Sequence, residues 1–143
     1  MKLISYKKEN IESFGVLTDK GIVDLKFSFE GFKQILSGGI QAIEKIQSVI
    51  DKSTLFINPA SVELLAPILN PGKILALAGN YTKHIIEAGM KLGLTASPRQ
   101  NTVPRPFIKP NTVLNHPNAI IPWPVYSKVI DYELELCIVI GKT

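Results

Sequence analysis

The sequence is poor in the features that define several common protein classes. Its 143 residues include one cysteine, Cys137, so an intrachain disulfide is excluded. No apolar run approaches the ~20 residues that a membrane-spanning helix requires. The opening MKLISYKKEN also lacks the long apolar core of a signal peptide. We therefore expect a soluble, cytoplasmic protein with no membrane partner.

Positive charge is present but it is not clustered. The 16 lysines and arginines exceed the 12 acidic residues by four, which gives the net charge of +4. The lysines are scattered along the chain, and only Lys7 and Lys8 are adjacent. No basic stripe is available to follow a phosphate backbone, so the pattern argues against nucleic acid as a partner.

The first half of the chain has the pattern of a small strand and helix module. Three short β-prone runs, KLISYKK, ESFGVLT and GIVDLKF, are separated by polar or glycine breaks such as TDKG, which predicts a meander. From Phe32 to Ile50, apolar residues recur at steps of three and four, which predicts a helix interrupted near Gly38 and Gly39. We place the module over residues 1–70 and a second region over residues 71–143.

The second region mixes strand and loop signals. ELLAPILNPG, at the boundary, is typical of a linker or an extended edge segment, and KILALAG predicts a compact buried strand. Residues 89–124 are rich in proline, so we expect a loop with short strands around PFIKP and AIIPW. His116, in LNHPN, is interpreted as a turn residue.

Alternation dominates the C-terminal run VIDYELELCIVIGKT. As a strand, it would place six apolar residues on one face, and Asp131, Glu133 and Glu135 on the other, followed by Cys137 and Val139. One interpretation is an edge strand whose charges discourage aggregation. The other is a partly buried pair, Glu133 and Glu135, whose α-carbons ~7 Å apart allow both carboxylates to converge on one cation. Oxygen ligands suit Mg²⁺, Mn²⁺ or Ca²⁺.

A second group of polar residues lies in AGNYTKHIIEAGMKLG. His84 and Glu87 are three residues apart on one expected helical face, where the carboxylate can fix the imidazole tautomer. Such a pair can act as a general base toward water, and it can equally be an ordinary surface pair. Lys109, in RPFIKPN, taken alone, is typical of a solvated loop lysine.

The chain resembles the fumarylacetoacetate hydrolase family in three stretches, AGNYTKHIIEAG, PFIKP and DYELELCIVIGK, taken in that order. Its opening MKLISYKKENIESFGVLTDKGIVDL is similar to the small N-terminal module that many bacterial and archaeal members carry. The resemblance implies an α+β, mainly β fold. A small N-terminal α/β module would be followed by the first part of the family's catalytic domain, a mixed β-sandwich or roll.

The resemblance also implies roles for five residues. The strand glutamates of such enzymes bind a divalent cation, usually Mg²⁺, which makes Glu133 and Glu135 the expected metal ligands. His84 and Glu87 match the helical pair that activates water or assists proton transfer, and Lys109 matches the lysine expected near the substrate. The implied reaction is hydrolysis or decarboxylation at a C–C bond of a 2-oxo or β-diketo acid, in which the cation stabilises the enolate that cleavage leaves.

The resemblance further implies segments that this chain does not contain. The family's third metal carboxylate, an aspartate, lies beyond the Glu-x-Glu strand, so we expect the site to be incomplete at the C-terminus. A homo-oligomer such as a dimer, or a complementing C-terminal segment, would complete it, and Asp131 is the first residue of this chain to test as a third ligand. Two other functions stay open: a hydratase or isomerase of the same family, and a non-catalytic fragment or assembly module.

Overall fold

The computed structural model describes residues 1–91 and 103–141. Contacts between α-carbons divide the chain into two compact units, residues 1–69 with 115–143, and residues 70–114. Strands and helices both occur, which confirms a mixed α and β fold. No helix in the described ranges has the length and apolar character needed to cross a membrane. Part of the expected proline-rich loop, residues 92–102, lies outside the described residues.

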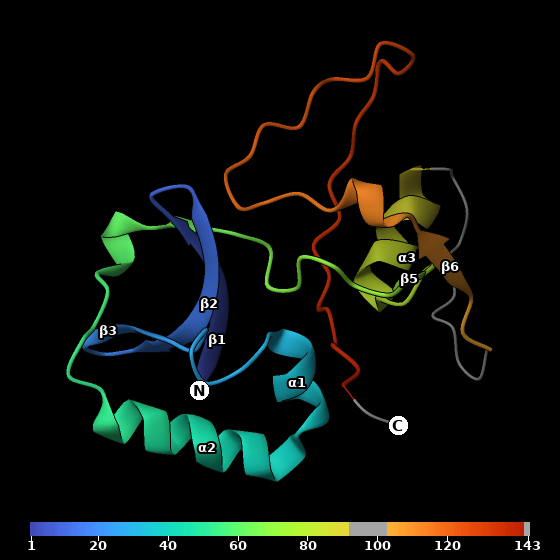
Figure 1. Ribbon diagram of the computed structural model, residues 1–143. Helices are drawn as coiled ribbons and strands as arrows, with labels where there is room; N and C mark the ends of the chain where they lie inside the picture. The colour runs from blue at the N-terminus through green and yellow to red at the C-terminus, as the bar shows by residue number, and fades with distance from the viewer. Residues whose placement is uncertain (92–102, 142–143) are drawn as a thin grey trace. The chain divides into compact units, whose positions relative to one another are not determined.

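An antiparallel sheet forms the framework of the first unit (Figure 1). It contains β1 (Lys2–Lys8), β2 (Ile11–Thr18), β3 (Gly21–Asp24) and the short β4 (Glu63–Leu64), in the order β3-β2-β1-β4. Glu9 and Asn10 connect β1 to β2 with φ angles of 50° and 63°. Two positive φ values are typical of the tight hairpin turn that matches strand twist. The three predicted N-terminal strands are confirmed, and the expected edge segment contributes β4.

Gly21, the first residue of β3, is needed where the sheet meets the loop around Ile57. Its φ of 133° is one that side chains rarely adopt, and a β-carbon there would lie 2.7 Å from the Ile57 carbonyl oxygen. The close approach arises because Ile22 and Ile57 exchange two backbone hydrogen bonds, of 2.8 and 2.9 Å. Glycine therefore lets this loop protect the outer edge of β3.

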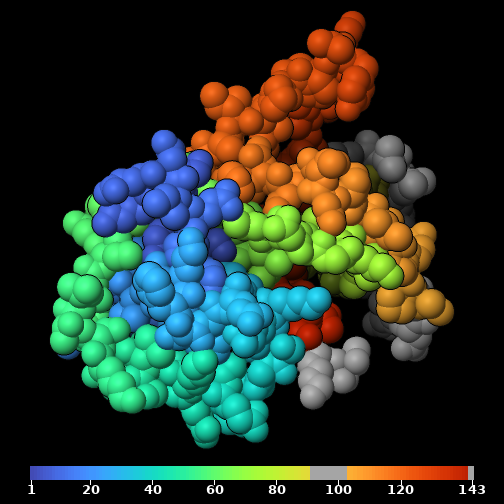
Figure 2. Space-filling model, viewed as in Figure 1, coloured from blue at the N-terminus to red at the C-terminus, as the bar shows by residue number. Residues whose placement is uncertain are grey.

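Two helices pack on the sheet. α1 (Phe32–Ser37) ends at Gly38, and α2 (Gly39–Lys52) begins directly after it, because Gly39 takes a left-handed φ of 56°. The predicted interruption is therefore confirmed. Buried residues from the strands and both helices form one core cluster. In Figure 2 the strands and helices that enclose this cluster form one continuous blue to teal surface. The members of the cluster are Val16, Val23, Leu25, Phe29, Ile35, Ala42 and Ile46.

A buried tyrosine ties β1 to the end of β3. Tyr6 is 1% exposed, and its hydroxyl donates a hydrogen bond to Oδ2 of Asp24. Ser13 Oγ donates to the same oxygen at 2.7 Å, and the backbone N–H of Lys26 donates to Oδ1 at 2.7 Å. Burial, together with the hydrogen bond to Asp24, raises the pKa of Tyr6 above its usual range. The neutral hydroxyl is therefore part of the folded state.

The second unit contains a two-stranded sheet and one helix. β5 (Ile74–Leu77) pairs with β6 (Pro106–Lys109) in antiparallel register, and α3 (Thr82–Lys91) follows β5. The predicted strand at PFIKP is confirmed. The strand predicted in KILALAG is confirmed by β5, but its predicted burial is wrong, since Leu75 is 60% and Leu77 37% exposed. A two-stranded ladder has too little surface to bury both faces of a strand.

The remainder of the first unit, residues 115–141, contains no strand. The expected strands at AIIPW and over residues 130–140 are therefore absent here. A strand needs a neighbour to pair with its backbone groups, and no described strand forms a ladder with this segment. Its side chains are mostly exposed, and Tyr132, Leu134 and Leu136 are each more than 80% accessible.

Candidate functional site

The helix that carries the predicted proton-transfer pair is positioned by a tight turn after β5. Gly79 takes a left-handed φ of 61°, and the N–H of Ile85 donates to the carbonyl oxygen of Tyr81 at 3.1 Å, which begins the α3 hydrogen-bond ladder. The left-handed conformation favours glycine at this position because it has no β-carbon. The sequence AGNY thus sets where α3 starts.

His84 and Glu87 both lie on α3, and both are exposed. Their spacing of three places them about one turn apart on the same side of the helix. Their neighbours Ile85 and Ile86 are partly buried, so the helix presents the polar pair beside its packed side. The predicted helical placement is confirmed, while the catalytic role stays a prediction.

Lys109 occupies the last position of β6 and is exposed. In the ladder it lies opposite Ile74, the first residue of β5, while Leu77 at the other end of β5 lies opposite Pro106. The α3 helix begins beyond Leu77. Three residues of strand separate these two ends by ~10 Å, so the register does not place the Lys109 backbone beside the start of α3.

Glu133 and Glu135 lie in the exposed segment of the first unit, outside any strand. The structure therefore does not provide the strand geometry that was expected to align their carboxylates. Over residues 1–91 and 103–141, no three His, Cys, Asp or Glu side chains come together in a group that could hold a metal ion. His84, Glu87 and Lys109 belong to the second unit and the two glutamates to the first.

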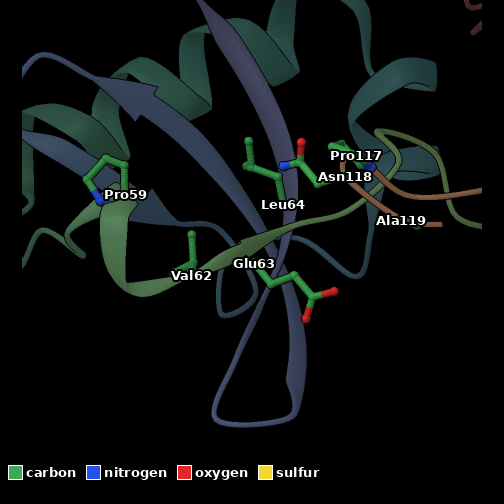
Figure 3. Close-up of a pocket in the computed structure, with 7 residues that line it drawn as sticks. All are labelled: Pro59, Val62, Glu63, Leu64, Pro117, Asn118 and Ala119. Atoms are coloured by element: carbon green, nitrogen blue, oxygen red, sulfur yellow. The ribbon is translucent and has the colours of Figure 1, made fainter.

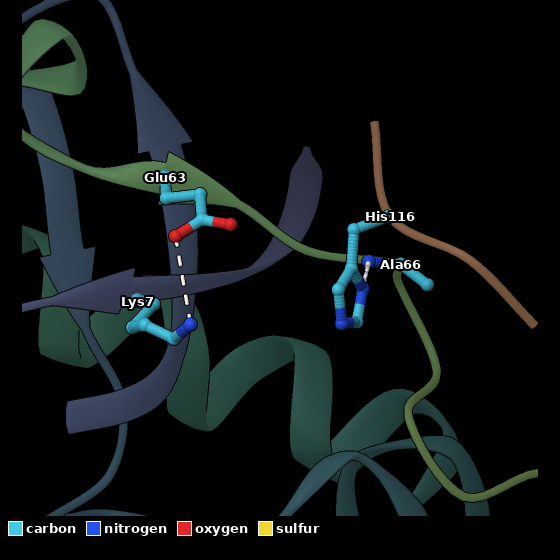
Figure 4. Close-up of polar contacts among 4 residues, drawn as sticks. All are labelled: Lys7, Glu63, Ala66 and His116. Atoms are coloured by element: carbon cyan, nitrogen blue, oxygen red, sulfur yellow. Dashed lines mark hydrogen bonds and ion pairs between the residues drawn. The ribbon is translucent and has the colours of Figure 1, made fainter. Parts of the chain in front are cut away.

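One open pocket of about 330 Å³ lies beside β4 in the first unit. Figure 3 shows its lining residues, with the carboxylate of Glu63 pointing away from Pro117 and Asn118. That carboxylate instead pairs with Lys7 of β1, at 3.5 Å (Figure 4). The rest of the pocket lining is mainly apolar and comes from Pro59, Val62, Leu64, Pro117 and Ala119. None of the five predicted site residues lines it.

His116 makes a contact that the sequence did not reveal. The predicted turn is confirmed, since the N–H of Ala119 donates to the carbonyl oxygen of His116 at 3.2 Å. In addition, Nδ1 of His116 accepts a hydrogen bond of 3.2 Å from the backbone N–H of Ala66 (Figure 4). The LNHPN motif signals the turn, but a partner fifty positions earlier in the chain leaves no local signal.

Comparison with known proteins places this chain in a family. Residues 73–143 match the family model described as "Fumarylacetoacetate (FAA) hydrolase C-terminal". The chain belongs to the fumarylacetoacetate hydrolase family. All five predicted site residues fall inside the matched range.

Three relatives illustrate the match. Oxaloacetate tautomerase fahd2, mitochondrial, of Xenopus laevis is 31% identical over 110 residues, which cover 77% of this chain and 32% of the relative. Maleylpyruvate hydrolase of Aquipseudomonas alcaligenes is 30% identical over 122 residues, covering 82% and 42% respectively.

The fumarylacetoacetate hydrolase domain-containing protein 2 homolog of Dictyostelium discoideum is 32% identical over 153 residues, covering 99% of this chain and 47% of the relative. Its alignment therefore includes the N-terminal sheet and helices. In each of these three comparisons the chain spans less than half of the relative's length.

Proposed function

We propose that this chain supplies part of the site of an enzyme acting on a 2-oxo or β-diketo acid in the presence of a divalent cation. The observation that carries the proposal is that Glu133, Glu135, His84, Glu87 and Lys109 all lie within the range matched to the family. Relatives named as a tautomerase and as a hydrolase give the chemistry its outline.

These two reactions share one demand on the protein. Tautomerisation of a 2-oxo acid removes a proton from the carbon beside the carbonyl, which leaves an enolate. C–C hydrolysis of a diketo acid also releases an enolate. Both therefore require a base near the reacting carbon and stabilisation of negative charge on the 2-oxo oxygen. The proposal covers hydrolysis or decarboxylation, and a hydratase or isomerase function is its alternative.

The two expected metal ligands are chemically suited to a hard cation. Glu133 and Glu135 offer carboxylate oxygens, which suit Mg²⁺, Mn²⁺ or Ca²⁺, and Mg²⁺ is commonly held by one or two carboxylates with substrate and water completing its shell. When bound, the cation would withdraw charge from the substrate's oxo oxygen. A homo-oligomer or a complementing segment would supply further ligands.

In this proposal, residues of α3 carry out the proton transfer. Nε2 or Nδ1 of His84 takes the proton from water or from the substrate carbon, and Glu87, one turn along, holds the imidazole in the required tautomer. Lys109 would attract the substrate carboxylate through its ammonium charge. Exposure of all three side chains leaves them accessible to a substrate.

The test separates metal binding from proton transfer. In an assembly with a complete site, His84→Ala and Glu87→Gln should each lower turnover of acylpyruvates or oxaloacetate by ~10²- to 10⁴-fold while metal affinity stays nearly unchanged. The 143-residue chain by itself is expected to be inactive. His116→Asn replaces the other histidine and serves as the matched control, with turnover retained. Equal activity of the wild type and His84→Ala on both substrates would reject the proposed role of α3.

Deuterium exchange distinguishes the two candidate reactions. Exchange at C3 of oxaloacetate in D₂O without loss of substrate would favour the tautomerase alternative, whereas metal-dependent loss of acylpyruvate would favour C–C hydrolysis. The absence of both reactions in every assembly that the chain forms would support the non-catalytic alternative.

A further inference from the structure

The outer edge formed by β4 and the two residues that follow it, Leu65 and Ala66, is covered at one point by a side chain. Leu65 donates its N–H to the carbonyl oxygen of Ser5 at 3.0 Å, and Tyr6 lies opposite Leu64 in the ladder. Because backbone groups alternate in direction along an antiparallel strand, Leu64 and the next alternate residue, Ala66, direct theirs away from β1. The N–H of Ala66 is the group that donates to Nδ1 of His116.

A tight turn sets the position of the His116 ring. Its carbonyl oxygen accepts from the N–H of Ala119 at 3.2 Å, Pro117 follows it, and Asn118 takes a φ of 61°. Proline and then a positive φ at the two central positions are the features of a type II turn. Oδ1 of Asn115 also accepts from the N–H of His116 at 2.9 Å. The backbone on both sides of the ring is therefore held.

The hydrogen bond to Ala66 requires one protonation state of the ring. Nδ1 can accept only while it carries a lone pair, which places the single proton of neutral imidazole on Nε2. Protonated imidazole donates from both nitrogens and cannot accept. Ala66 is 4% exposed with the turn in place, so loss of the His116 acceptor leaves its N–H without a partner until the turn moves away and water reaches it.

We propose that His116 is a pH-sensitive latch that holds the turn 115–119 on the β4 edge when neutral and releases it when protonated. Release would leave the outward backbone groups of Leu64 and Ala66 open at the edge, beside the pocket that the turn helps to line. The charged side chains on the neighbouring strands are Lys2, Lys7 and Lys8 of β1 and Glu63 of β4. Lys7 and Glu63 pair with each other at 3.5 Å. Asn115 and Asn118 on the turn are neutral.

The latch is tested by NMR on the whole chain between pH 5 and 8. Lowering the pH through this range should shift the Ala66 amide signal together with the His116 ring signals. Exchange protection of the Ala66 amide, normalised for intrinsic rate, should fall about fivefold to tenfold over this range. His116→Asn should remove this pH dependence. His84→Asn, at the chain's other histidine, should preserve it.

The nitrogen chemical shifts of the wild-type ring give a measurement that no variant can confound. At pH 8 they should show a bare Nδ1 and a protonated Nε2. A proton on Nδ1, an Ala66 amide that ignores the titration, or an unchanged response in His116→Asn would each overturn the proposal.

Discussion

Two β-prone stretches of the first unit differ sharply in how far their apolar side chains are buried. Val16 and Ile22 of the β2–β3 hairpin are 1% and 0% exposed, while Leu134 and Leu136 of the C-terminal segment are 91% and 83% exposed. Both stretches are rich in β-branched or leucine side chains. The hairpin has pairing partners and two helices above it, whereas no described strand pairs with residues 130–140. A strand pattern becomes a strand only where partners satisfy its backbone.

The largest expected effect contrasts these stretches directly. Ile46 of α2 is completely buried in the core, so Ile46→Ala should lower the free energy of unfolding by about 2–5 kcal/mol. Leu134→Ala, at the exposed position, should change it by no more than about 0.5 kcal/mol. Urea denaturation followed by circular dichroism measures both. Comparable losses for the two variants would mean that the C-terminal segment is packed in solution.

A smaller loss is expected at the loop that protects the edge of β3. Gly21→Ala forces a side chain into a φ of 133° and toward the Ile57 carbonyl oxygen, so it should cost about 1–3 kcal/mol. Gly72→Ala is the matched control, since a β-carbon there would meet no atom within 4 Å. Equal denaturation midpoints for the two variants would contradict the close approach.

The smallest effect depends on pH. Tyr6→Phe removes one hydrogen bond to Asp24, while Ser13 and Lys26 keep theirs, so the loss at pH 7 should be about 1 kcal/mol. Folding favours the neutral hydroxyl because the pKa of Tyr6 is raised in the folded state. Its contribution is therefore complete below the unfolded pKa of ~10 and is lost as the pH rises above it.

Unfolding curves at pH 8 and pH 11 check this sign. The difference in the free energy of unfolding between wild type and Tyr6→Phe should shrink at the higher pH. Only the wild type has a Tyr6 hydroxyl that ionises in the unfolded chain and stays neutral in the folded one, and this favours unfolding as the pH rises. A difference that grows with pH would show that the sign is wrong.

The sequence predicted residues 1–69 of the first unit well because the signals there are local. Turn residues between β1, β2 and β3 and the glycine pair between α1 and α2 act within a few residues, so strands and helices appeared where expected. Burial of β5 and pairing of residues 130–140 depend on neighbours far along the chain. Periodicity cannot supply such neighbours, and those two predictions failed.

The candidate site divides in the same way. The helical spacing of His84 and Glu87 follows from the α3 sequence and was predicted. Convergence of Glu133 with Glu135 depends on strand pairing, which the described residues do not provide. The contact between His116 and Ala66 joins positions whose local sequences do not reveal each other, so it required a structure.

Binding of Mn²⁺, a paramagnetic substitute for Mg²⁺, tests the central proposal most directly. We predict that Mn²⁺ titrated into the ¹⁵N-labelled chain broadens the amide signals of residues 131–137 first. Glu133→Gln and Glu135→Gln should each require roughly tenfold more Mn²⁺ for the same broadening. Glu44→Gln, at an exposed acid of α2, should behave as the wild type. Broadening centred elsewhere, or unchanged in both glutamate variants, would contradict the proposal that Glu133 and Glu135 hold the cation.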